Sequence, residues 1–157
     1  MRSPFYFIVE PLEGKRYNNS KDISGMDFIT SSSQENHMAS NREAIVISTP
    51  LNYKGPVTKG DTLLVHHNVF KFYYDMKGRE KSGKSYFKDN LFFVDNEQFF
   101  LYKQNDQWFS HYKYCFVEPI PAEESFLMKN FDEEPLMGKM KYPNAYLESK
   151  GVRKGMK

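Results

Sequence analysis

Three short patterns in the sequence contain residue types that often carry chemistry. His66 and His67 are adjacent and could suggest a metal site, but neighbouring strand residues point to opposite faces and no cysteine or carboxylate cluster accompanies them. Residues 78–84 approximate a phosphate-binding loop without the required glycine–x4–glycine–lysine–serine/threonine spacing. The single cysteine, Cys115, fits a small core residue on a strand better than a nucleophile. We therefore predict no catalytic residue, no metal and no cofactor, and expect a protein that is not an enzyme.

The composition points to strands rather than helices. Aromatic residues make up 17% of the 157 residues, and aromatic side chains favour β-structure, so an all-β fold is expected. The 22 Lys and Arg residues nearly balance the 20 Asp and Glu residues, which does not favour nucleic acid as a partner. No apolar stretch approaches the roughly 20 residues of a membrane helix. One cysteine suits a reducing compartment, and a cytoplasmic location is expected.

The element around which the chain is organised is a Lys59-Gly60-Asp61 turn followed by an aliphatic run at residues 62–65. Gly60 can adopt the positive φ that a tight turn demands, and the Asp61 side chain can bond nearby backbone amides. The run after the turn predicts a strand buried on at least one face. Further strands are expected at residues 5–10 and 43–49.

A long polar segment separates the first two predicted strands. Residues 15–40 are rich in Ser and Asn and contain one apolar island, formed by Met26, Phe28 and Ile29. A segment of this composition cannot bury enough apolar surface to offset its ordering entropy, which predicts a long mobile loop.

The later part of the chain contains turns, a predicted linker and a repeat. Asp95 and Asn96 predict a hairpin turn between strands at 91–94 and 99–102, and the prolines after residue 118 predict a linker. Residues 114–120 echo residues 6–12, and residues 150–156 echo residues 54–61, in the same order. We expect a barrel domain over residues 1–118 and an incomplete second copy over residues 119–157. Chance similarity in a tyrosine-rich sequence is the alternative.

Several of these elements, in this order, resemble the GroES-type co-chaperonins. The resemblance covers most of residues 5–117. It rests on five features in order: the strand ending at Val9-Glu10-Pro11, the loop with an island after Ser24-Gly25, the strand Ala44 to Ile47, the Val57–Val65 turn and strand, and residues 94–101. In character the match is closest to divergent, virus-encoded members, such as those of phages.

The resemblance implies a chaperone function that assists protein folding. It implies a GroES-like irregular β-barrel that forms a homo-oligomeric ring and caps an ATP-bound chaperonin ring through the mobile loop. The positions that match the family's docking tripeptide imply chaperonin-binding residues at Met26 and Phe28, with Ile29 adjacent. In an extended segment Met26 and Phe28 would point the same way and leave Asp27 toward solvent.

Two alternatives stay open at this stage. The apolar island could pack onto the barrel as a satellite cluster. The protein could also be a barrel-type virion structural or nucleic-acid-binding module, because Tyr73, Tyr74, Tyr86 and Phe87 lie among basic residues that could contact a single strand.

Overall fold

The computed structural model describes residues 1–18, 20–23, 26–29, 38–122 and 133–157. The chain divides into two compact units, Met1–Gln104 and Asn105–Lys157. The division falls before the predicted boundary at residue 118.

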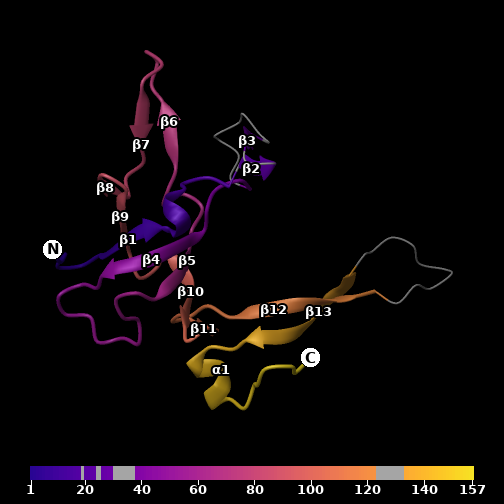
Figure 1. The fold of residues 1–157 in the computed structure, drawn as a ribbon. Coiled ribbons are helices and arrows are strands. Elements are labelled where there is room, and N and C mark those ends of the chain that lie inside the picture. Colours follow the sequence, from indigo (N-terminus) through magenta and orange to yellow (C-terminus); the bar gives the residue numbers. More distant parts are fainter. Residues whose placement is uncertain (19, 24–25, 30–37, 123–132) are drawn as a thin grey trace. The chain divides into compact units, whose positions relative to one another are not determined.

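The first unit is built from antiparallel strands (Figure 1), which confirms the prediction of an all-β fold. Its main sheet has the strand order β10-β5-β4-β1-β9-β8. Two short two-stranded hairpins, β2–β3 and β6–β7, accompany it. The elements are β1 (Phe7–Pro11), the 3-10 turn η1 (Leu12–Gly14), β2 (Ser20–Ile23), β3 (Met26–Ile29), β4 (Glu43–Ser48), β5 (Thr62–Val65), β6 (Phe72–Tyr74), β7 (Glu80–Ser82), β8 (Tyr86–Lys88), β9 (Leu91–Val94) and β10 (Phe99–Gln104).

The predicted turn before β5 has the expected chemistry. Gly60 has a φ of 95°. The Asp61 carboxylate accepts hydrogen bonds from the backbone amide of Thr58 at 2.6 Å and from its hydroxyl at 3.2 Å. Leu63 and Val65, two residues apart on β5, are completely buried, so this strand presents one face to the core.

The main sheet curls around its core. Phe7 on β1 and Phe99 on β10 are separated by three strand-to-strand steps, which would place them about 14 Å apart in a flat sheet. Their ring centroids are 5.3 Å apart in an edge-on arrangement. One buried cluster joins strands from across the order, including Val46 of β4 and Phe92 of β9. Even so, within the described residues no ladder joins β8 to the opposite edge, so a closed barrel is not observed.

The predicted hairpin between β9 and β10 is wrong. Asp95 and Gln98 do form a turn, with the Gln98 amide donating to the Asp95 carbonyl at 3.0 Å. The two strands then diverge, because β9 pairs with β1 and β8 while β10 pairs with β5. Both strands can thereby bury alternate side chains in the same core, Phe92 and Val94 from one and Phe99 from the other.

The second unit contains β11 (Gln107–Ser110), β12 (Phe116–Pro121), β13 (Glu133–Tyr142) and the short helix α1 (Ala145–Ser149). β12 and β13 pair as an antiparallel ribbon. The predicted linker therefore begins inside a strand, since Pro119 and Pro121 belong to β12. A two-stranded ribbon leaves one side of each strand outside the ladder, which is where proline is tolerated.

Candidate functional site

The ends of the long polar segment meet at one point on the first unit. The Asn41 amide donates to the Arg16 carbonyl at 3.0 Å, and the Asn18 amide donates to the Ala39 carbonyl at 2.7 Å. Between these bonds, Tyr17 and Ser40 form an isolated antiparallel bridge. We call Arg16, Tyr17, Ser40 and Asn41 the neck, because residues 18–39 leave and return through them.

Asn41 satisfies several backbone groups at once. Its side chain is 5% exposed, and its amide nitrogen donates to the carbonyls of Leu12 at 3.0 Å and Lys15 at 2.8 Å. Its side-chain oxygen accepts a bond from the Glu43 amide at 3.0 Å, at the start of β4. The residue therefore ties the end of the segment to the turn after β1. Buried carbonyls without such a donor would destabilise the fold.

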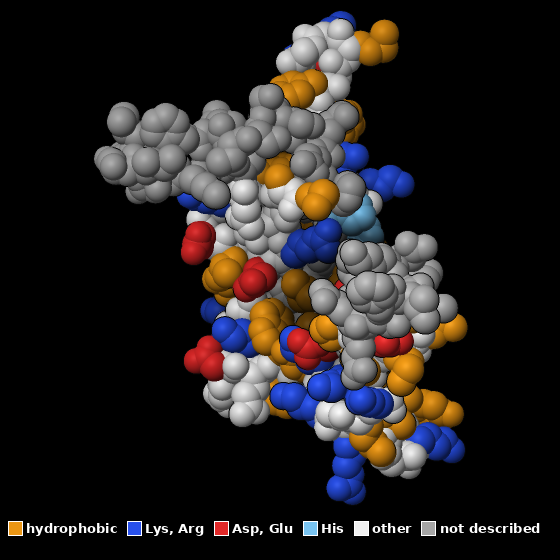
Figure 2. Space-filling view, turned by 90° about the vertical axis from the view of Figure 1, so that its right-hand side faces the viewer, with side chains coloured by type: hydrophobic (Ala, Val, Ile, Leu, Met, Phe, Trp, Pro, Cys, Tyr) orange, Lys and Arg blue, Asp and Glu red, His pale blue; other side chains and the backbone are white. Residues whose placement is uncertain are grey.

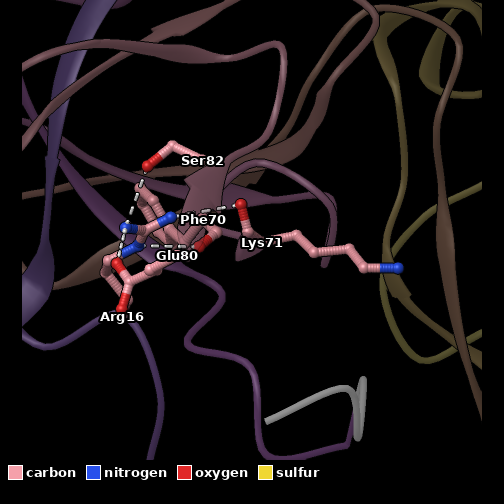
Figure 3. Close-up of polar contacts among 5 residues, drawn as sticks. All are labelled: Arg16, Phe70, Lys71, Glu80 and Ser82. Carbon is pink, nitrogen blue, oxygen red and sulfur yellow. Dashed lines mark hydrogen bonds and ion pairs between the residues drawn. The ribbon is translucent and has the colours of Figure 1, made fainter. Parts of the chain in front are cut away.

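Arg16 ties the start of the segment to the β6–β7 hairpin, as Figure 3 shows. Its guanidinium donates to the Phe70 carbonyl at 2.9 Å, the Lys71 carbonyl at 3.1 Å and the Ser82 hydroxyl at 3.3 Å. It also lies 3.8 Å from the Glu80 carboxylate, and only 18% of its side chain is exposed. The planar guanidinium of arginine has several donors in a fixed fork and can bond to all of these acceptors. A lysine ammonium cannot reproduce this donor geometry.

Aromatic rings complete the Arg16 environment. The guanidinium carbon lies 4.9 Å from the ring centroid of Phe72 and 5.2 Å from that of Phe92. Burial lowers the pKa of Arg16, and the negative charge of Glu80 opposes this shift. The ordinary pKa is so high that the side chain stays charged at neutral pH.

The three predicted chaperonin-binding residues lie together on β3. This strand pairs with β2, with Met26 opposite Ile23, Phe28 opposite Lys21 and Ile29 opposite Ser20. The segment predicted as a long mobile loop over residues 15–40 therefore contains a short hairpin, β2–β3, among its described residues. Ser24 and Gly25, which the resemblance also used, lie outside the described residues, as do residues 30–37.

The structure places the other candidate residues, the two histidines, residues 78–84 and Cys115, in surroundings that differ from those expected. β5 ends at Val65, and the rings of His66 and His67 lie against each other with centroids 4.1 Å apart, not on opposite faces. In the part of the chain that the structure describes, no cluster of three or more His, Cys, Asp or Glu could hold a metal ion. Residues 78–84 contain the strand β7 and not the helix that follows a phosphate-binding loop. Cys115, expected in a core, is exposed.

The aromatic and basic residues of the alternative hypothesis lie partly on the β6–β7 hairpin. Tyr73 and Tyr74 are about half exposed, and Tyr73 pairs with Lys81 across the hairpin. Acidic partners accompany the basic residues, since Asp75 lies 3.4 Å from Arg79. On the face that Figure 2 shows, Lys and Arg side chains are interspersed with hydrophobic and acidic ones.

Comparison with known proteins returns no matching family model, no matching curated protein and no matching solved structure. No helix in the described part of the chain has the length and apolar character needed to cross a membrane.

Proposed function

We propose that this protein is a co-chaperonin of the GroES type. Its first unit acts as a barrel-like subunit of a homo-oligomeric ring, and the ring caps an ATP-bound chaperonin in the cytoplasm through residues 18–39. The observation that carries the proposal is the neck, in which Asn41 and Arg16 fix both ends of this segment by buried polar contacts. A docking segment held this way starts from the same place on every subunit.

The curl of the main sheet supports the barrel part of the proposal. Phe7 and Phe99 come into contact across three strand steps, as side chains do when a sheet wraps toward closure. The turn at Gly60 and the strand after it, on which the resemblance partly rests, are both formed.

The backbone of β3 suits weak and repeated docking. This four-residue strand contains three large apolar residues, Met26, Phe28 and Ile29. Burial of one such side chain contributes about 1.5–3 kcal/mol to binding. Fixing these side chains on a partner costs conformational entropy, which offsets part of this gain. Several such segments on one ring would bind together by avidity and still release when the ring changes state.

The test uses a double variant and a matched control. Met26→Ser together with Phe28→Ser removes the apolar contacts, so ATP-dependent co-sedimentation with a purified chaperonin ring should be lost. Asp27→Ser changes the residue between them, which is expected to face solvent, and should leave binding intact. Circular dichroism should show both variants folded. ATP-dependent binding retained by the double variant would contradict the proposal.

A virion or nucleic-acid-binding module is the second candidate. The half-exposed rings of Tyr73 and Tyr74, with Lys81 opposite Tyr73, favour it because bases stack on exposed aromatic rings beside cations. It predicts salt-sensitive binding of a single-stranded oligonucleotide that Tyr73→Ala weakens. Oligonucleotide binding without any chaperonin binding would select this candidate.

A further inference from the structure

The ribbon of the second unit has the same strand register as the centre of the first. In the first unit Val9 lies opposite Val46, and the register shifts at the step before Val9. In the second unit Val117 lies opposite Met140, with a register shift at the corresponding step. The matched pairs are Ile8–Ser48 with Phe116–Tyr142, Val9–Val46 with Val117–Met140, Glu10–Ile45 with Glu118–Lys139, and Pro11–Ala44 with Pro119–Gly138.

The turn at Gly60 in the first unit and the turn at Gly155 in the second have the same backbone hydrogen bonds. The Gly60 amide donates to the Val46 carbonyl at 2.8 Å, and the Val46 amide donates to the carbonyl of the residue after the glycine at 2.9 Å. Gly155 and Met140 make the same two bonds at 2.7 and 2.8 Å. The two glycines have φ values of 95° and 89°. In both turns, the residue after the glycine donates to the carbonyl three positions back at 3.2 Å.

Matching registers, matching register shifts and matching turns favour duplication over chance. A chance echo of residue types would not bring the same three backbone hydrogen bonds to the same positions. The second unit thus corresponds to β1, β4 and the turn that leads into β5. In this correspondence Lys157 takes the place of Thr62, and the described residues of the second unit contain no counterpart of the rest of β5.

The face that is a core in the first unit is open in the second. Phe7 and Val9 are completely buried, whereas their counterparts Cys115 and Val117 are exposed, Val117 by 52%. In the first unit β5 pairs with β4 through Ala44 and Leu63, and its buried side chains join Phe7 and Val9 in one core cluster. Among the described residues, β13 pairs with β12 and with no second strand. An unpaired strand edge beside exposed apolar side chains is a template for a further strand.

We infer that residues 114–157 form the first part of a second copy of the β1–β4 module, and that the open edge of β13 at Met137–Lys139 binds a β-strand. The occupant is an extended segment of a partner polypeptide with the alternating apolar pattern of Thr62–Val65. It pairs antiparallel with β13, as β5 pairs with β4, and its apolar side chains cover Val117. This inference is independent of chaperonin binding, since it concerns a different unit and a different surface.

The test supplies such a strand from the chain itself. A variant is made in which a copy of residues 63–104 follows Lys157, because a linked segment has a high effective concentration at its site. Cys115 is the sole cysteine, and the appended residues contain none, so thiol modification under native conditions reports on this face. We expect modification of Cys115 to slow by at least about tenfold in the extended chain. The amide of Gly138, two residues from Met140 on the same edge of β13, should gain protection from hydrogen exchange.

A matched extension carries Leu63→Asp and Val65→Asp in the appended copy only. It has the same length and should leave Cys115 as reactive as in the original chain. Equal reactivity of Cys115 in the original chain and in the unmodified extension would overturn the inference. Protection of Cys115 in the original chain that rises with protein concentration would also overturn it, because a second copy of this chain would then occupy the edge.

Discussion

Asn41 and Arg16 meet through a backbone hydrogen bond of 3.0 Å at the point where residues 18–39 leave and rejoin the first unit. Each also sends its side chain to a different part of the first unit, Asn41 to the turn after β1 and Arg16 to the β6–β7 hairpin. The neck is therefore fixed from two sides. Its residues are buried or half-buried, so changes in them act on stability as well as on the position of the segment.

Replacing Asn41 with Ala should destabilise the first unit by about 2–3 kcal/mol, because the carbonyls of Leu12 and Lys15 lose their buried donor. Urea denaturation followed by far-UV circular dichroism measures the change. Asn52→Ala, at an exposed position, is the control and should alter stability little. Equal effects of the two substitutions would contradict the role assigned to Asn41.

Arg16→Lys should also destabilise the first unit, by about 1–3 kcal/mol, although it keeps the charge. A lysine ammonium cannot reach the acceptors at Phe70, Lys71 and Ser82 with the geometry of the guanidinium fork. The comparison is Arg79→Lys, whose side chain is 63% exposed in an ion pair and should have almost no effect. A stable Arg16→Lys variant would show that charge alone suffices at the neck.

Gly60→Ala and Gly155→Ala should each cost about 1–2 kcal/mol, because both glycines have a positive φ that a Cβ disfavours. Nothing lies within 4 Å of an added Cβ at either site, so the cost is conformational and not steric crowding. The sole tryptophan, Trp108, lies in the second unit and reports its unfolding by fluorescence. Gly155→Ala should shift the fluorescence transition, and a shift caused equally by Gly60→Ala would indicate that the units unfold together.

Alkaline pH should destabilise the first unit through Tyr53 and Tyr102, which pack against the core. Burial raises the pKa of both phenols, and the Asp61 charge adds to this shift. The folded state therefore holds these protons more tightly than the unfolded state, whose tyrosine pKa is about 10. The contribution to stability is complete below that pH and is lost as pH rises through the higher folded pKa.

The measurement is the free energy of unfolding across this alkaline range. A variant with Tyr53→Phe and Tyr102→Phe should lose less stability there than the original chain. Tyr146→Phe, on an exposed side chain, should follow the original chain. Identical pH profiles for all three proteins would refute the assignment.

The parts of the fold that the sequence predicts are those governed by local chemistry. Gly60 and Asp61 define a turn through their own backbone and side-chain preferences, and the aliphatic run at β5 needs no knowledge of its partners. The all-β class follows in the same way from strand-forming residue types. These features depend on a few neighbouring residues, so a single sequence contains them.

The parts that it does not predict depend on distant partners. The turn at Asp95 reverses the chain, but the pairing of β9 with β1 is decided by which arrangement buries Phe92 and Phe99 together. Arg16 and Asn41 look like ordinary polar loop residues, because their acceptors are carbonyls supplied by other segments. Met26, Phe28 and Ile29 were found from an apolar island in a polar stretch, and their role as chaperonin-binding residues stays a prediction.

The neck also determines where mechanical load enters the first unit. A pull on Asn18 and Ala39 acts on the chain at both sides of the neck, and so on Arg16 and Asn41 together. From Arg16 the tension spreads to the backbone at Phe70, which is fully buried, and so into the rigid interior. The Asn41 side chain carries its share to the turn after β1, so the load is divided between two separate parts of the first unit.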